Sequence, residues 1–163
     1  MKIEIRGYTK EDVSGMSLVW NAVVESGDAF PQTEPLDEKT APPFFSGQSY
    51  CGVAADQETR QILGLYILHP NNVGRCGHIA NASYAVASSA RGLKIGEKLV
   101  LDCMEQGRRL GFRILQFNAV VRTNTAARRL YEKLGFRQLG VIPGGFLMKD
   151  GHYEDICPYY HIL

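Results

Sequence analysis

The most informative part of this chain reads Val86-Ala87-Ser88-Ser89-Ala90-Arg91-Gly92-Leu93-Lys94-Ile95-Gly96 and continues into an amphipathic stretch that ends at Leu110. The residues just before it, 80–86, are small and tolerant of extended backbone, which predicts a strand. From 94 to 109, apolar residues recur at helical spacing and form one face, and charged residues occupy most of the other positions. The members of that face are Ile95, Leu99, Cys103 and Leu110. We therefore expect a strand, a short loop and a helix in that order.

The loop between this strand and this helix is a candidate anion-binding site. A strand–loop–helix connection directs several backbone N–H groups and the positive end of a helix toward one point, which suits a phosphate or diphosphate. Gly92 and Gly96 permit close approach because they lack a Cβ atom. A plain connection is the alternative reading, because neither the Gly-Lys-Ser/Thr of a P-loop nor the three-glycine dinucleotide spacing is present.

Length and charge narrow the class of protein. The chain has 163 residues, which fits one domain spanning 1–163. Hydrophobic residues make up 45% and charged residues 21%, as in ordinary globular proteins. The net charge of +1 argues against a nucleic-acid partner. Arginines nevertheless crowd between 108 and 129, which indicates either a solvated face or attraction toward a polyanionic cofactor.

Cysteine and histidine spacing gives no sign of a metal. The four cysteines form no Cys-x-x-Cys pair, and the four histidines form no His-x-x-x-His pair. Cys76 and His78 could share a strand face, but further ligands are missing. We expect no metal, reduced thiols and a cytoplasmic location. The N-terminus alternates charged and apolar residues like a strand, and no apolar run is long enough for a membrane partner.

Periodicity along the whole chain predicts a mixed sheet with helices. Strands are expected at 2–8, 49–55, 61–68, 76–87, 114–121, 136–141 and 152–163. Helices are expected at 9–25, 95–110 and 124–134. The proline-rich segment 30–47 reads as a lid, a substrate wall or a loop pinned by aromatics, with one helical turn at 37–41. Pro143-Gly144-Gly145 reads as a turn. The fold class is α/β (α+β), a single domain whose central, mostly antiparallel mixed sheet is flanked by helices.

Two segments together resemble the GCN5-related N-acetyltransferases, the GNAT superfamily. Arg91-Gly92-Leu93-Lys94-Ile95-Gly96 is similar to the family's acetyl-CoA loop, Gln/Arg-x-x-Gly-x-Gly/Ala. The segment 124–136 is similar to the family's next block, Asn-x-x-Ala-x-x-Leu-Tyr-x-x-x-Gly-Phe. One departure stands out, because Lys94 occupies the place of the middle glycine. Its side chain would either narrow the approach of the diphosphate or contact a phosphate itself.

The resemblance implies acetyl-CoA as co-substrate and assigns roles to residues. Backbone N–H groups near the strand end would polarise the thioester. Tyr131 matches the family's usual acid, and a phenol with a pKa near ~10 stays protonated at neutral pH. Packing in the core is the alternative role for this tyrosine. The implied cofactor-binding residues are Ala85, Val86, Arg91, Gly92, Leu93, Lys94, Ile95, Gly96, Asn124 and Ala127.

A finer resemblance concerns the acetyl acceptor. Residues 78–82 and 116–121 look like a subgroup that includes a yeast enzyme acetylating proline analogues such as azetidine-2-carboxylate. In that subgroup the asparagines matching Asn81 and Asn118 line the active site; the alternative is two strand amides satisfied by backbone. Glu34 is assigned to the acceptor site as one candidate base. Glu25, Asp28, His78 and a water held by Asn81 are the other candidates.

These observations predict an N-acetyltransferase that moves an acetyl group directly from acetyl-CoA to a small-molecule amine, such as an amino acid or proline analogue, in a ternary complex. A protein N-terminal or lysine acetyltransferase is the second enzyme hypothesis. An acetyl-CoA-binding sensor without turnover is a hypothesis of another class. The apolar terminal strand and its Pro158-Tyr159-Tyr160 tip are candidates for a homodimer contact.

Overall fold

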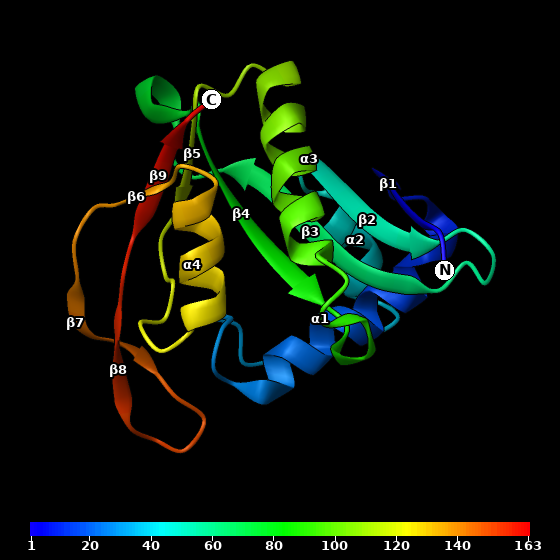
Figure 1. Ribbon diagram of the computed structural model, residues 1–163, viewed down its shortest axis with the longest axis horizontal. Coiled ribbons are helices and arrows are strands. Elements are labelled where there is room, and N and C mark those ends of the chain that lie inside the picture. Colours follow the sequence, from blue (N-terminus) through cyan, green and yellow to red (C-terminus); the bar gives the residue numbers. More distant parts are fainter.

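The computed structural model describes residues 1–163 and is built around one seven-stranded sheet in the order β1-β2-β3-β4-β5-β9-β6 (Figure 1). Neighbouring strands are antiparallel except β4 and β5, which are parallel. β7 and β8 form a separate hairpin. The strands are β1 (Ile3–Gly7), β2 (Tyr50–Asp56), β3 (Ile62–Pro70), β4 (Ile79–Val86), β5 (Ile114–Phe117), β6 (Arg137–Gln138), β7 (Ile142–Leu147), β8 (Tyr153–Ile156) and β9 (Tyr159–Ile162). This sheet confirms the predicted fold class.

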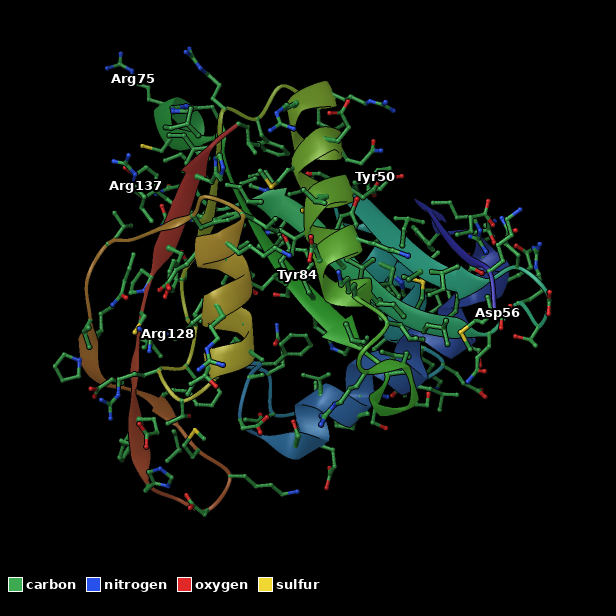
Figure 2. All side chains as sticks on the ribbon, viewed as in Figure 1. Tyr50, Asp56, Arg75, Tyr84, Arg128 and Arg137 are labelled. Atoms are coloured by element: carbon green, nitrogen blue, oxygen red, sulfur yellow. The ribbon has the colours of Figure 1, made fainter.

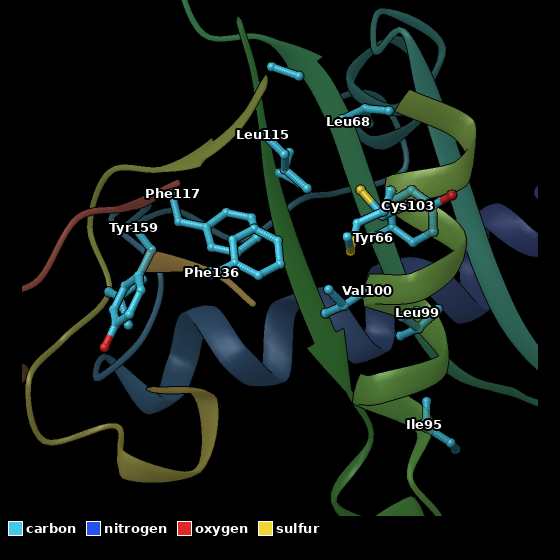
Figure 3. Packing of buried hydrophobic residues seen from close by; sticks show 14 of the residues in the cluster. Tyr66, Leu68, Ile95, Leu99, Val100, Cys103, Leu115, Phe117, Phe136 and Tyr159 are labelled. Atoms are coloured by element: carbon cyan, nitrogen blue, oxygen red, sulfur yellow. The ribbon is translucent and has the colours of Figure 1, made fainter. Parts of the chain in front are cut away.

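Helices cover both faces of the sheet. The helices are α1 (Val13–Ser26), α2 (Ala41–Ser46), α3 (Ile95–Arg109) and α4 (Thr125–Lys133), and short 3-10 turns lie at Lys10–Asp12, Gly74–Cys76 and Ser88–Ala90. One core of 18 buried residues lies under α3, and Figure 3 shows part of it, with Leu99 and Cys103 facing the sheet. A second core of 14 buried residues lies under α1 and α2. None of the helices has the length and apolar character that a membrane crossing requires.

The parallel strands β4 and β5 separate soon after they meet. Their pairing covers only Ile79–Asn81 against Ile114–Gln116, and β4 then continues to Val86 without a partner on that side. The N–H of Ala87 donates to the carbonyl of Leu63 at 2.8 Å, so odd-numbered residues of β4 bond to β3. The backbone N–H groups of Tyr84 and Val86 therefore face the opening between the separated strands.

Several predicted strands are shorter than expected. The strand expected from Cys76 begins at Ile79, because Gly74–Cys76 form a 3-10 turn, so Cys76 and His78 do not share a strand face. The strand expected at 114–121 ends at Phe117, and only Arg137–Gln138 of the segment 136–141 pair. β5 and β6 both end beside Tyr159 of β9, since Phe117 and Gln138 each pair with it.

The proline-rich segment contains a helix that the sequence reading missed. Pro42 and Pro43 are the second and third residues of α2, in the first turn, where a backbone N–H has no partner within the helix and its absence costs nothing. Phe45 is fully buried, and Phe44 lies 5.2 Å from Trp20 between ring centroids. The predicted turn at 37–41 is present, since the N–H of Ala41 donates to the carbonyl of Asp37 at 2.9 Å, but it leads into α2.

The C-terminal region also corrects the prediction. Pro143-Gly144-Gly145 lies within β7 at a register irregularity, and the hairpin turn instead follows Leu147. The expected single terminal strand is broken before Pro158 into β8 and β9. β9 runs between β5 and β6, so Tyr159 is fully buried and the tip around it is not a free surface.

The amphipathic face of α3 is confirmed except at its end. Ile95, Leu99 and Cys103 are buried, whereas Leu110 is 49% exposed. The helix ends at Arg109, and Gly111 then turns the chain with a φ of +87°. Val100, Met104 and Gly107 complete the buried face instead.

Candidate active site

The loop between β4 and α3 forms a shallow hollow at the helix N-terminus. Arg91, Gly92, Lys94 and Gly96 line this hollow of about 280 Å³. No side chain caps the helix, so the N–H groups of its first turn remain open to a ligand. Lys94 adopts the left-handed conformation with φ +57°, which explains why glycine suits this position in similar loops.

A groove of about 560 Å³ leads from this hollow along β4 toward α4. Val86, Arg91 and Gly96 line it on the loop side, while Leu130 and Tyr131 line it on the α4 side. Asn124 caps α4, since its Oδ1 accepts from the N–H of Ala127 at 3.3 Å, and both of these residues also line the groove. In Figure 1, α4 lies over the opening between β4 and β5. The groove is long and polar at one end, as an extended cofactor with a charged end requires.

A smaller cavity of about 200 Å³ lies at the far end of the groove, between the separated strands. Tyr84, Asn124, Ala127 and Tyr131 line both spaces, so the cavity adjoins the groove. Phe30 and Pro31 line one side of the cavity, and Phe30 also packs on Trp20 with 4.4 Å between ring centroids, so the substrate-wall and pinned-loop readings of the proline-rich segment both stay predictions. No charged side chain lines this cavity.

Tyr131 stands at the junction of groove and cavity. Its ring packs against Phe117 with 4.5 Å between centroids and against Phe136 with 5.7 Å. Burial raises the pKa of Tyr131 above the ordinary tyrosine value, with smaller contributions from Cys103 and Tyr159. The hydroxyl of Tyr159 donates to Glu132, whereas no such bond engages the hydroxyl of Tyr131. Tyr131 is therefore a protonated phenol whose hydroxyl is free to act.

Asn81 and Asn118 both line the cavity, from β4 and from just beyond β5. The Oδ1 of Asn81 accepts from the N–H of Ala82 at 2.8 Å. Asn118 donates through Nδ2 to Asn71 Oδ1 at 2.6 Å, and its Oδ1 accepts from Gln116 at 3.0 Å. The sequence analysis missed Asn71, because only the fold brings the loop after β3 next to Asn118.

Tyr84 is a second residue that the sequence reading missed. It lies between β4 and α3 (Figure 2) and lines both the groove and the cavity. Its buried hydroxyl has no hydrogen-bond partner, and burial raises its pKa well above the ordinary value. The strand alternation that predicted β4 gave no signal for the separation from β5 that places Tyr84 at this junction.

The predicted cofactor residues are largely brought together. Those that line the hollow or the groove are Val86, Arg91, Gly92, Lys94, Ile95, Gly96, Asn124 and Ala127. Ala85 and Leu93 do not line them: Ala85 is buried against the α1 side with its N–H toward β3, and Leu93 is 40% exposed outside the hollow.

The predicted base candidates are more scattered. Glu34 is exposed and lines none of the three spaces. Asp28 lines the groove, whereas Glu25 pairs with Lys149 at 3.1 Å on the surface. His78 is exposed before β4. No group of three or more His, Cys, Asp or Glu side chains gathers in a metal-binding arrangement.

Comparison with known proteins agrees with this geometry. The family model of the acetyltransferase (GNAT) family matches residues 19–136, which include β2 to β5, the loop before α3, α3 itself and α4. The chain therefore belongs to the GNAT family of acetyl-CoA-dependent N-acetyltransferases.

Particular relatives span nearly the whole chain. N-acetyltransferase aca1 of Schizosaccharomyces pombe is 29% identical over 93% of this chain and 81% of its own length. The structure of a GCN5-related N-acetyltransferase from Kribbella flavida is 31% identical, with a TM-score of 0.90 over 99% of this chain and 98% of that one. A phosphinothricin acetyltransferase from Sinorhizobium meliloti, solved with acetyl-CoA, shares the fold at 20% identity, with a TM-score of 0.89 over 100% of this chain and 89% of that one.

Proposed function

We propose that this chain acetylates the amine of a small molecule by direct transfer from acetyl-CoA in a ternary complex, and that the acceptor is an amino acid or a cyclic imino acid such as a proline analogue. The observation that carries the proposal is the position of Tyr131, which lines both the groove and the small uncharged cavity. A thioester arriving along the groove and an amine held in the cavity would meet at this residue.

The cofactor would enter with its diphosphate at the N-terminus of α3. The open N–H groups of the first helical turn and the positive charge of Arg91 and Lys94 favour an anion there. The rest of the cofactor would follow the groove between β4 and α4. The backbone N–H groups of Tyr84 and Val86, which face the opening, are placed to donate to the acyl oxygen and to stabilise the oxyanion.

The transfer would then proceed in two bond changes. The neutral amine nitrogen attacks the thioester carbon and forms a C–N bond, and the C–S bond breaks as the carbonyl reforms. The thiolate takes the proton of the Tyr131 hydroxyl, and the amine nitrogen releases a proton to solvent, from which Tyr131 is protonated again. The raised pKa of Tyr131 keeps the proton available until this step.

The cavity favours a small acceptor over a protein lysine or a polyamine. Its volume of about 200 Å³ is small, and its lining holds amides and aromatic rings but no carboxylate to pair with an extra ammonium group. Asn81 and Asn118 supply polar contacts on one side of it. Their match to the proline-analogue subgroup supports the finer acceptor assignment.

Substitution of the two asparagines tests the acceptor assignment. We expect Asn81→Ala and Asn118→Ala each to raise the KM for the amine about tenfold, because each loses a polar contact worth about 1.5 kcal/mol. The KM for acetyl-CoA should stay within about twofold of the unsubstituted value. Asn72→Ala, on the exposed loop after β3, is the matched control. An unchanged amine KM in both variants would contradict the assignment.

Two further assignments complete the proposal. The four unpaired cysteines support a cytoplasmic location with reduced thiols. Exposed apolar side chains recur along the chain from β6 to β8, including Leu139, Ile142, Leu147 and Tyr153, and a second copy of this chain is the partner proposed for them. Sedimentation equilibrium tests this homodimer, and a monomer at all concentrations would contradict it.

A further inference from the structure

The first turn of α3 carries a carboxylate where the cofactor's diphosphate is proposed to bind. Counting from Lys94 as the N-cap, Glu97 is the third helical residue and lies in the first turn. A glutamate at this position commonly folds back onto the N-terminal N–H groups of its own helix. Glu97 also lines the hollow together with Arg91 and Lys94. A free Glu97 carboxylate would thus compete with a diphosphate for the same donors and repel it.

In the structure Glu97 is turned away from those donors. Its Oε2 accepts a hydrogen bond from Lys133 Nζ at 2.8 Å, and no side chain caps α3. The exposed fraction of the side chain is 26% for Glu97 and 59% for Lys133. The bond from Lys133 is the main reason that the pKa of Glu97 is lowered, so the carboxylate is charged at neutral pH. The competing anion is present but is held by another helix.

The partner lysine comes from the last turn of α4, across the hollow from α3. Leu130, one turn earlier on α4, lines both the hollow and the groove. A Cβ atom added at Gly96 would come within 3.6 Å of Leu130, so α4 sits directly against the first turn of α3. The placement of α4 therefore fixes where Lys133 can reach and which way Glu97 turns.

We propose that Lys133 is a positioning residue for cofactor binding, which holds the Glu97 carboxylate away from the N-terminus of α3 and so leaves those N–H groups open to the diphosphate of acetyl-CoA. The inference rests on the cofactor placement proposed above. It concerns binding of the cofactor alone and is independent of which amine is acetylated.

A double-mutant cycle on acetyl-CoA binding, measured by calorimetry without any amine, tests this role. We expect Lys133→Met to weaken binding about three- to tenfold, because Glu97 is released toward the helix N-terminus. Glu97→Gln should bind as tightly as the unsubstituted chain or more tightly. The double variant should return to within about twofold of Glu97→Gln, since Lys133 has no carboxylate left to hold.

Other results separate the competing accounts. If Lys133 contacted a phosphate directly, the Lys133→Met substitution would weaken acetyl-CoA binding equally with or without the Glu97 carboxylate. Such additivity of the two substitutions would overturn the inference. If the Lys133–Glu97 ion pair only linked α3 to α4 at the surface, Lys133→Met would change thermal stability slightly and leave acetyl-CoA affinity unchanged. That result would also overturn the inference. Failure of the unsubstituted chain to bind acetyl-CoA would overturn the cofactor placement as well.

A second ion pair on the same helix provides the control. Arg109 Nε lies 3.1 Å from Glu105 Oε1 near the far end of α3, remote from the hollow. Arg109→Met and Glu105→Gln remove charges of the same kind from the same helix. We expect neither variant to shift acetyl-CoA affinity by more than about twofold.

Discussion

Tyr131 is the residue on which the proposed transfer depends, because a thiolate leaving group needs a proton at the moment the C–S bond breaks. Its ring is held by Phe117, Phe136 and Tyr159, so its hydroxyl has a defined position between groove and cavity. The surrounding apolar packing also raises its pKa. The position of the Tyr131 hydroxyl and its protonated state thus follow from the same aromatic contacts.

Replacement of Tyr131 by Phe should lower kcat by about 10²- to 10⁴-fold, the usual contribution of a general acid. The ring packing is retained, so acetyl-CoA affinity and thermal stability should change little. Steady-state kinetics with calorimetric binding checks this, and Tyr153→Phe, which is 67% exposed on the hairpin, is the matched control. A Tyr131→Phe enzyme of undiminished kcat would remove Tyr131 from the role of acid.

The pH dependence of kcat provides a test without mutation. Because burial raises the pKa of Tyr131, its hydroxyl stays protonated at every pH below the ordinary phenol value. We expect kcat to stay level or to rise between about pH 7 and about pH 9.5, as the amine loses its proton. A fall in kcat across this window that disappears in Tyr131→Phe would show a lowered tyrosine pKa and contradict this account.

Lys94 introduces backbone strain into the loop proposed to bind the cofactor. Its φ of +57° is a left-handed conformation that side chains with a Cβ atom disfavour. Lys94→Gly should raise the free energy of unfolding by about 0.5–1 kcal/mol, since relief of strain exceeds the added freedom of the unfolded chain. Lys94→Ala keeps the strain while removing the charge. Urea denaturation that shows equal stability for the two variants would contradict the strained-backbone reading.

The separation of β4 from β5 leaves room for the cavity that we propose as the acceptor site. Phe117, the last residue of β5, packs with its ring centroid 5.6 Å from that of Tyr84 and 4.5 Å from that of Tyr131. Its ring therefore links β5 to residues of β4 and α4 that line the cavity.

Phe117→Leu should therefore affect stability and catalysis together. Loss of ring volume in the core should lower the free energy of unfolding by about 1–2 kcal/mol. The same change removes support from Tyr131, so kcat should fall by about tenfold. Phe146→Leu, in the small hairpin cluster, is the control that should lose stability without losing kcat. Equal kcat in the two variants would contradict the link between this packing and catalysis.

For the whole molecule, the elements with strong local signals were predictable and those that depend on long-range pairing were not. The period of Ile95, Leu99 and Cys103 gave α3, and Asn124 with Gly135 gave the ends of α4, where Gly135 has a φ of +92°. The short pairing of β5 depends on β4 and β9, which lie far from it along the chain, whereas the irregular β7 depends on a register shift within its own hairpin with β8. α2 was missed because its two prolines usually indicate a loop, although they suit a first helical turn.

The candidate site followed the same division. The loop residues and Tyr131 were predicted because two motifs stand in the family's order, separated by a helix and a strand, and the structure brings them to the same groove. Asn71 and Tyr84 were missed, since only the separation of β4 from β5 gives them their places. Glu34 was assigned to the acceptor site as one of several candidate bases, but it is exposed and lines neither the groove nor the cavity.

The central claim, acetyl transfer to a small-molecule amine, is tested most directly by measuring free thiol released from acetyl-CoA with a panel of amines. The panel should include amino acids, cyclic imino acids, polyamines and peptides with free N-termini or lysines. The account predicts rapid release with amino acids or cyclic imino acids and only background release with polyamines and peptides. Faster turnover of a peptide, or background release across the panel by a chain that binds acetyl-CoA tightly, would contradict it.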